Sequence, residues 1–320
     1  MIDYISTTTQ SFDCKVTHIF PHLGNPDAVY SSGWRKYYLQ GCERLAVWVH
    51  PTFGLRLEGS ISYWWQGNNF SFSRHSFVEA INHINGLLHV DLWKSVLNMF
   101  EFGLILEVQM KPKEYIQHHK TLPHEGLLLN EKPQDKGSFR WWKDKNVSLK
   151  MYDAKKNILM KQGEDRREVI RNAGWEEAGE FLKWECHYLR PECLNKGVGL
   201  RLHQLVNSDW NQIIKEDVYL QYKRLLPMKS IILPENKKDL STADILALTY
   251  AEESINEGRT LDELRKVLYS RINAIPDDVL TKSDKDARKR QVKALLDKLQ
   301  ESPESKWDLS EKIQEALEAG

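Results

Sequence analysis

The sequence has few cysteines, and they do not form the pattern of a disulfide framework or a metal site. The chain of 320 residues contains four, none spaced as a CxxC pair. The ligand spacing of structural zinc sites is therefore absent. Cys186 and Cys193 are close enough in sequence to pair, but we expect free thiols in a reducing cytoplasm.

Long apolar segments are also missing. No apolar run approaches the about 20 residues that span a bilayer. The start, Met1-Ile2-Asp3-Tyr4, lacks the basic and then apolar pattern of a signal peptide. We therefore expect a globular cytoplasmic protein with no membrane partner.

Several catalytic motifs do not occur. The chain has no HExxH, no GxGxxG and no GxxxxGK[ST], which argues against a zincin and against nucleotide binding by those routes. None of the eleven histidines is followed two residues later by another. The chemistry must therefore be sought in carboxylates, lysines and tyrosines.

An excess of charge of one sign is absent overall, but the charges are unevenly distributed. Lys+Arg and Asp+Glu are equal at 45 each; residues 235–320 hold 15 against 19, which leaves 30 against 26 for residues 1–234. Residues 136–161 are basic and include Arg140, Trp141, Trp142 and Lys143. Basic residues among aromatics suit phosphate contact and base stacking, and these four are candidate DNA-binding residues. A solvated basic hairpin explains the same pattern.

Alternation of apolar and polar residues predicts strands over much of the chain. The predicted strands are 45–50, 55–65, 98–109, 138–143, 147–153 and 181–189, with a helical segment over 75–97 that is broken near Asn85-Gly86. The order strand, strand, helix, strand occurs twice, over 45–109 and 138–190. This predicts an α+β fold: an antiparallel sheet of two β-β-α-β units, with helices on one face and the other face partly open.

The C-terminal part of the sequence is different in character. Residues 227–240 indicate a linker, and helical patterns follow, one of them opening at Thr260-Leu261-Asp262-Glu263. The expected organisation is a sheet domain over 1–226, a linker over 227–240 and an all-helical domain over 241–320. Basic residues over 284–293 form a face that is either solvated or in contact with DNA.

The outward face of four predicted strands carries a set of polar residues: Glu58 and Ser60; Glu101 and Glu107; Lys150 and Tyr152; Glu185 and His187. Metal-dependent attack on a phosphodiester needs carboxylates for a cation, a nucleophile and a positive charge. Glu101 and Glu107 are about 20 Å apart along a strand, so only one can bind the ion. Glu101 is favoured because Glu185 has the matching place in the second unit, with His187 as a possible further ligand. Tyr152 is the candidate nucleophile; a surface tyrosine is the alternative.

Three segments resemble replication initiators of filamentous phages and related plasmids, a rolling-circle group without a His-x-His pair. They are Leu57-Glu58-Gly59-Ser60 with Gln66-Gly67-Asn68-Asn69-Phe70; Met99-Phe100-Glu101-Phe102 through Glu114-Tyr115-Ile116; and Leu149-Lys150-Met151-Tyr152-Asp153 followed by Lys183-Trp184-Glu185. They lie between about residues 50 and 225, and the C-terminal helices have no counterpart.

The resemblance implies that Tyr152 attacks origin DNA, leaving a 3′-hydroxyl and a 5′-phosphotyrosyl link, in a bacterial host cell. It implies that Glu101 and Glu185, with Glu58, hold Mg²⁺ or Mn²⁺. A lysine is common two residues after the tyrosine, where this chain has Ala154, so Lys150 or Lys155 must substitute. The helical tail would bind the origin or a host helicase or polymerase.

Two other functions remain open. One is a non-catalytic protein that binds single-stranded nucleic acid on Trp64, Trp65, Trp141 and Trp142. The other is a metal-dependent nuclease that uses water, which would form no covalent protein–DNA adduct.

Overall fold

The structure is a computed structural model. It describes residues 1–11, 19, 22–69, 72–121, 126–129, 138–160, 179–227, 231–232, 249–251, 253–255, 259–297, 300–301 and 305–319. These residues form two compact units. The first comprises Met1–Gln117, Thr121–Leu226 and Leu309–Gly320; the second comprises His118–Lys120 and Pro227–Asp308.

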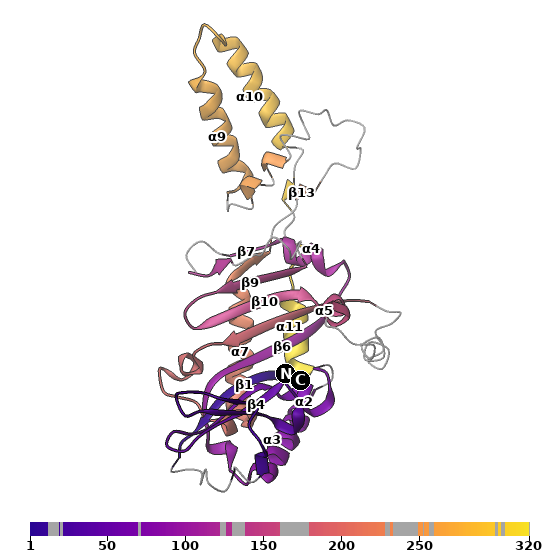
Figure 1. Ribbon diagram of the computed structural model, residues 1–320. Helices are drawn as coiled ribbons and strands as arrows, with labels where there is room; N and C mark the ends of the chain where they lie inside the picture. Colours follow the sequence, from indigo (N-terminus) through magenta and orange to yellow (C-terminus); the bar gives the residue numbers. More distant parts are fainter. Residues whose placement is uncertain are drawn as a thin grey trace. The chain divides into compact units, whose positions relative to one another are not determined.

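A ten-stranded sheet dominates the first unit, in the order β2-β3-β4-β5-β1-β6-β11-β10-β9-β8, and each neighbouring pair is antiparallel (Figure 1). Its strands are β1 (Ile2–Thr9), β2 (Ala28–Val29), β3 (Arg35–Tyr38), β4 (Leu45–His50), β5 (Gly54–Ser60), β6 (Val96–Val108), β8 (Leu128–Leu129), β9 (Phe139–Lys143), β10 (Val147–Asp153) and β11 (Glu180–Tyr188). Four short strands lie outside it: β7 (His119–Thr121), β12 (Leu225–Pro227), β13 (Ile231–Ile232) and β14 (Gln300–Glu301).

The described residues also form helices. The α-helices are α2 (Ile61–Gln66), α3 (Arg74–Leu88), α4 (Pro112–Gln117), α5 (Ala154–Met160), α7 (Ser208–Lys223), α9 (Leu261–Ala274), α10 (Lys282–Leu296) and α11 (Ser310–Ala319). The 3₁₀ turns are η1 (Leu39–Gly41), η2 (Leu92–Lys94), η4 (Pro191–Asn195) and η5 (Leu202–Val206). Within the described segments, none of the helices combines the length and apolarity that membrane crossing requires.

The core of the first unit lies between one face of the sheet and the helices α7 and α11. Tyr222 of α7 packs edge-on against Trp184 of β11, and Phe100 of β6 stacks on Tyr188 of β11. All four rings are fully buried. Alternation along β6 and β11 therefore turns the polar side chains to the opposite face. The predicted α+β fold with an antiparallel sheet is confirmed.

Strand β1 is the main departure from the predicted sheet. The two-unit scheme did not include it, yet it lies between β5 and β6 and pairs with both. Residues 2–9 are rich in Ile and Thr, which favour strands, although no strand was predicted there. The two-unit duplication itself stays a prediction.

Two predicted elements end differently in the structure. The strand expected over 55–65 stops at Ser60, which caps α2 by accepting a hydrogen bond from the Tyr63 backbone N–H. Gly67 ends that helix in the left-handed region, with φ 77°. The helix expected over 75–97 ends at Leu88, and β6 already begins at Val96.

The predicted domain boundaries need one correction. Helix α11 was assigned to the C-terminal helical domain, but Leu309–Gly320 belongs to the first unit. Ile313 and Leu317 are buried, and the helix packs on β6 and α7. The burial of these two side chains is the physical reason. Most of the predicted linker 227–240 lies outside the described residues.

Helices α9 and α10 pack together in the second unit. Leu264 and Leu296 form a small core with Ala251 and Ile255. The helix start predicted at Thr260 is confirmed, and the structure shows a capping box there: the Glu263 backbone N–H donates to Thr260 Oγ1 and the Thr260 backbone N–H donates to Glu263. An all-helical C-terminal domain stays a prediction.

Candidate active site

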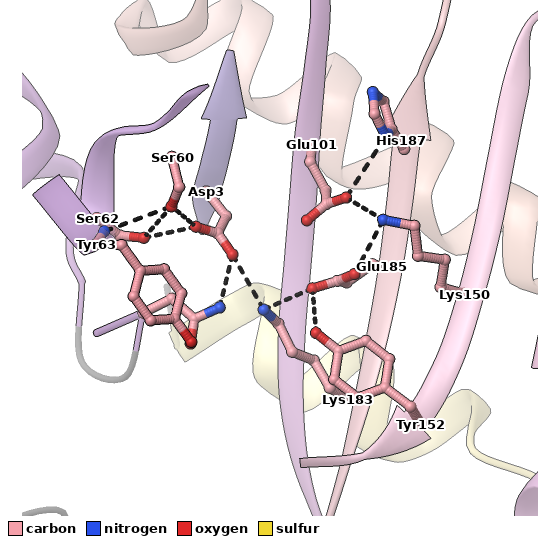
Figure 2. A network of polar contacts seen from close by, with 11 residues as sticks. Asp3, Ser60, Ser62, Tyr63, Glu101, Lys150, Tyr152, Lys183, Glu185 and His187 are labelled. Atoms are coloured by element: carbon pink, nitrogen blue, oxygen red, sulfur yellow. Dashed lines mark hydrogen bonds and ion pairs between the residues drawn. The ribbon is translucent and has the colours of Figure 1, made fainter. Parts of the chain in front are cut away.

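A polar cluster lies on the open face of the sheet, on its central strands β1, β6, β11 and β10 (Figure 2). Antiparallel pairing places Lys150 opposite Glu185, Tyr152 opposite Lys183 and His187 opposite Glu101. Gly103 leaves room for them, because a Cβ there would lie 3.1 Å from Lys183 Cε. A cavity of about 490 Å³ opens over the cluster and is also lined by Tyr4, Arg44, Tyr63, Phe139 and Asn157.

Three carboxylates converge at the centre of this cluster. One oxygen each of Asp3, Glu101 and Glu185 lies within 4.8 Å of the other two, and all three residues are buried. The structure therefore brings the predicted ligands Glu101 and Glu185 together. Glu107, not chosen from the sequence, is exposed near the C-terminal end of β6.

Asp3, and not the predicted Glu58, is the third carboxylate beside Glu101 and Glu185. Because β1 lies between β5 and β6, Glu58 is one strand further from Glu101 than Asp3 is. Glu58 accepts a hydrogen bond from Tyr4 Oη at 3.0 Å instead. The β1–β6 register shifts between Ile2 and Ile5. This irregularity interrupts the strict alternation of the strand, so the neighbouring residues Asp3 and Tyr4 both line the cavity.

Asp3 is held by a dense set of donors. Ser60 Oγ, Ser62 Oγ and Asn69 Nδ2 donate to its carboxylate at 2.6, 2.5 and 2.6 Å. Burial raises the pKa of Asp3, but the Lys183 ammonium and these donors outweigh burial and hold the pKa well below its usual range. Asp3 is therefore a fixed negative charge.

Two lysines bridge the carboxylates. Lys183 Nζ lies 2.6 Å from Glu185 and 3.2 Å from Asp3, and only 2% of the Lys183 side chain is exposed. Lys150 Nζ lies 2.6 Å from Glu101 and 3.6 Å from Glu185. Lys150 was predicted as a catalytic lysine. Lys183 is part of the segment Lys183-Trp184-Glu185 named from the sequence, but no role was predicted for it.

Tyr152 is directly joined to this cluster. Its hydroxyl donates a hydrogen bond to Glu185 Oε1 at 2.6 Å, and Lys183 Nζ lies 5.8 Å from its ring centroid. Burial and the Glu185 charge raise the pKa of Tyr152 well above its usual value. The phenol is therefore protonated at neutral pH, with Glu185 placed to accept its proton.

The two glutamates differ in proton affinity. Burial and the neighbouring Glu185 charge raise the pKa of Glu101 to about 7. Burial also disfavours ionised Glu185, but Lys183 and Lys150 outweigh it and lower the pKa of Glu185. Such a split is typical of paired catalytic carboxylates, in which the ionised member serves as base.

His187 lies beside the carboxylates. Its Nδ1 is 3.5 Å from Glu101 Oε2, and its ring packs 5.5 Å from that of Tyr4. Burial and the Lys150 charge lower the pKa of His187 to about 4, so the ring is neutral at pH 7. Its Nε2 is buried and has no hydrogen-bond partner among the described residues.

Other predicted site residues lie elsewhere. Lys155 Nζ donates to the Gly179 carbonyl at 2.7 Å, outside the cluster. Trp142 is 1% exposed on the core face of β9, so the prediction that it binds DNA is wrong. Alternation leaves its neighbour Trp141 on the cavity face, where it donates to Ser148 Oγ and has Lys143 Nζ 6.0 Å from its ring. Arg140 donates to the Ile116 and Gln117 carbonyls at 3.0 Å.

The donor set fits a divalent cation in its chemistry. Three carboxylates supply the oxygen ligands that Mg²⁺ and Mn²⁺ prefer. With all three ionised, the lysines leave a formal charge of −1 on the cluster. A divalent cation held by Asp3, Glu101 and Glu185 would therefore compete with Lys150 and Lys183 for the same oxygens.

Comparison with known protein families, curated proteins and solved structures found no match.

Proposed function

We propose that this protein nicks and rejoins DNA through a phosphotyrosine intermediate and starts rolling-circle replication of a phage or plasmid. The observation that carries the proposal is the hydrogen bond from Tyr152 to Glu185 inside a buried cluster of three carboxylates and two lysines. The resemblance of the sequence motifs supplies the reaction and the substrate, origin DNA.

In the proposed reaction, Tyr152 Oη attacks the phosphorus and its proton passes to Glu185. The bond from phosphorus to the 3′ oxygen breaks, and that oxygen takes a proton from water in the open cavity. The products are a free 3′-hydroxyl and a 5′-phosphotyrosine, so the bond energy is kept for rejoining. Lys150 and Lys183 stabilise the negative charge that develops on the phosphate oxygens. Mg²⁺ or Mn²⁺, when bound by Asp3, Glu101 and Glu185, would supply further positive charge.

A structural observation weakens the non-catalytic alternative. That function relied on Trp64, Trp65, Trp141 and Trp142 as stacking platforms, but Trp142 is in the core. Trp64 and Trp65 lie on α2, and both pack against His83. The four rings therefore do not form one open surface.

We also propose that the tail contributes to origin binding or contacts a host helicase or polymerase. The basic face predicted on α10 is partly neutralised by acids: Lys285 lies 2.6 Å from Asp277, and Lys289 lies 3.6 Å from Asp286. The basic face of α10 is therefore better suited to a protein partner or a weak DNA contact than to strong binding of phosphates.

The test uses labelled single-stranded oligonucleotides and supercoiled plasmid, with Mg²⁺, Mn²⁺ or EDTA, on denaturing gels. We expect a metal-dependent, SDS-resistant adduct that carries the 3′-labelled fragment and disappears in Tyr152→Phe. Tyr63→Phe is the matched control, because Tyr63 lines the same cavity without touching Glu185 in any described contact. Cleavage without an adduct would indicate the hydrolytic nuclease, and an adduct that persists in Tyr152→Phe would exclude Tyr152 as the nucleophile.

A further inference from the structure

A second group of aromatic and basic side chains lies at the β3–β4–β5 end of the sheet. We call it the aromatic–basic patch; it consists of Tyr30, Trp34, Lys36, Trp48, His50, Phe53 and Arg56. None of these residues was assigned a role from the sequence.

The rings of the patch are close to one another and accessible. Tyr30 lies 5.2 Å from Trp48, Trp34 lies 5.3 Å from His50, and His50 lies 4.5 Å from Phe53. Tyr30 and Phe53 are 44% and 58% exposed. Aromatic side chains contribute most to a fold when they are buried, so the fold does not explain why these two rings face solvent.

Cations lie over these rings. Lys36 Nζ is 5.3 Å from the Trp48 centroid, and the Arg56 guanidinium is 5.4 Å from the Trp34 centroid. Two acids have described contacts at the margin: Asp27 accepts from the Tyr38 backbone N–H, and Glu58 accepts from Tyr4. Positive charge interleaved with flat rings matches a chain of phosphates and bases.

The patch shares the sheet face that carries the candidate active site. Lys36, Trp48 and Arg56 form one cross-strand row. Glu58 lies two residues after Arg56 on β5 and accepts a hydrogen bond from Tyr4. The Tyr4 ring packs on His187, which lies beside Glu101 in the candidate active site. From β4 to β11 there are four strand spacings, about 19 Å in all. A few nucleotides can span this distance.

We propose that the aromatic–basic patch stacks bases of single-stranded DNA whose neighbouring phosphates enter the Tyr152 cavity. That the ligand is single-stranded DNA rests on the proposed function. The new element is the protein surface that holds this DNA. Stacking on rings tolerates any base, so the patch supplies affinity and the direction of approach rather than sequence recognition.

The experiment measures anisotropy of a fluorescein-labelled 20-nucleotide single strand with the full-length protein. We expect Tyr30→Ala/Phe53→Ala to bind about 5- to 100-fold more weakly, from the loss of base stacking. Arg56→Ala should reduce the slope of log affinity against log salt by about 0.7. Tyr219→Ala and Lys223→Ala are the matched controls. Tyr219 and Lys223 form a cation–ring pair at 5.0 Å on α7, which covers the opposite face of the sheet, so both variants should bind DNA as wild type does. Circular dichroism melts verify that each variant is folded.

The outcomes separate the patch from the catalytic proposal. Unchanged affinity in Tyr30→Ala/Phe53→Ala overturns the patch, whether or not an adduct forms. Weakened binding by this variant supports the patch even if no adduct is found with any substrate. A changed oligomeric state by sedimentation with unchanged DNA affinity makes the patch a protein interface and overturns the proposal.

Discussion

At the residue scale, the site depends on charges that are buried only because they are paired. Asp3, Glu185 and Lys183 are each almost inaccessible, and each has an opposite charge within hydrogen-bonding distance. Removing one member of such a set leaves an uncompensated buried charge, which is more costly than losing the pair's attraction. The two lysine ammonium groups contact the same carboxylates that would bind a divalent cation.

We therefore expect Lys183→Met to lower the free energy of unfolding by about 3–5 kcal/mol in EDTA. Mg²⁺ or Mn²⁺ should raise the melting temperature of this variant more than that of the wild type, because the metal replaces the lost ammonium. Thermal melts with and without metal measure both effects. Lys145→Met, at an exposed lysine, is the control; equal metal shifts in Lys183→Met and wild type would contradict competition.

Asp144 illustrates a pH-dependent contribution outside the cluster. Its carboxylate accepts from the backbone N–H groups of Asn146 and Val147 and pairs with Arg224 at 2.7 Å. Burial raises the pKa of Asp144, but these donors outweigh burial and the pKa is lowered from 3.8. The contribution to stability is therefore present above the unfolded-state pKa and is lost as the pH falls through the folded-state pKa.

Asp144→Asn should thus reduce the free energy of unfolding by about 1–3 kcal/mol at pH 7. The difference from wild type should shrink as the pH falls below about 4, the unfolded-state pKa, and should be lost below the lowered folded-state pKa, where the wild-type carboxyl is also neutral. Urea unfolding at a series of pH values tests this, and a difference that is constant with pH would refute it.

At the element scale, helix α11 joins the far end of the chain to the sheet. Ile313 is fully buried on α11, which packs on β6 and α7, and the Leu309 backbone N–H donates to Tyr222 Oη at 2.7 Å. We expect Ile313→Ala to cost about 2–5 kcal/mol of stability in the sheet unit. Chemical unfolding followed by near-ultraviolet circular dichroism measures it. Gln314→Ala, exposed on the same helix, should have little effect; a neutral Ile313→Ala would mean that α11 is dispensable.

At the scale of the whole molecule, the second unit is largely an insertion in the sequence of the first. Lys223 and Ser310, on either side of it, are joined by a hydrogen bond of 2.6 Å. A flexible ten-residue Gly/Ser linker has an end-to-end distance of about 16–19 Å. Such a linker is long enough to replace residues 230–306.

We expect the protein with this replacement to unfold cooperatively, with a stability within about 1 kcal/mol of the wild-type sheet unit. Truncation after residue 226 should instead give an unstable protein, because it removes α11 as well as the second unit. Calorimetry of the two proteins, each compared with the full chain, tests this. If the linker protein is unfolded, the second unit is required for the first to fold.

The sequence by itself determined the strands around the site and the face that each side chain takes. Alternation with a period of two is a local property, so it placed Glu101, Lys150, Tyr152 and Glu185 on the polar face of their strands. It also put Trp141 and Trp142 on opposite faces, and a prediction that used both as one surface ignored that rule.

The tertiary structure alone decided which strands are neighbours. Pairing of β6 with β11 brings Glu101 to Glu185 across 84 positions of sequence, and the insertion of β1 exchanges Glu58 for Asp3. Strand order depends on long-range pairing that leaves no local period in the sequence. For the same reason the buried role of Lys183 and the aromatic–basic patch, built from residues 30–56, emerged only when the sheet was assembled.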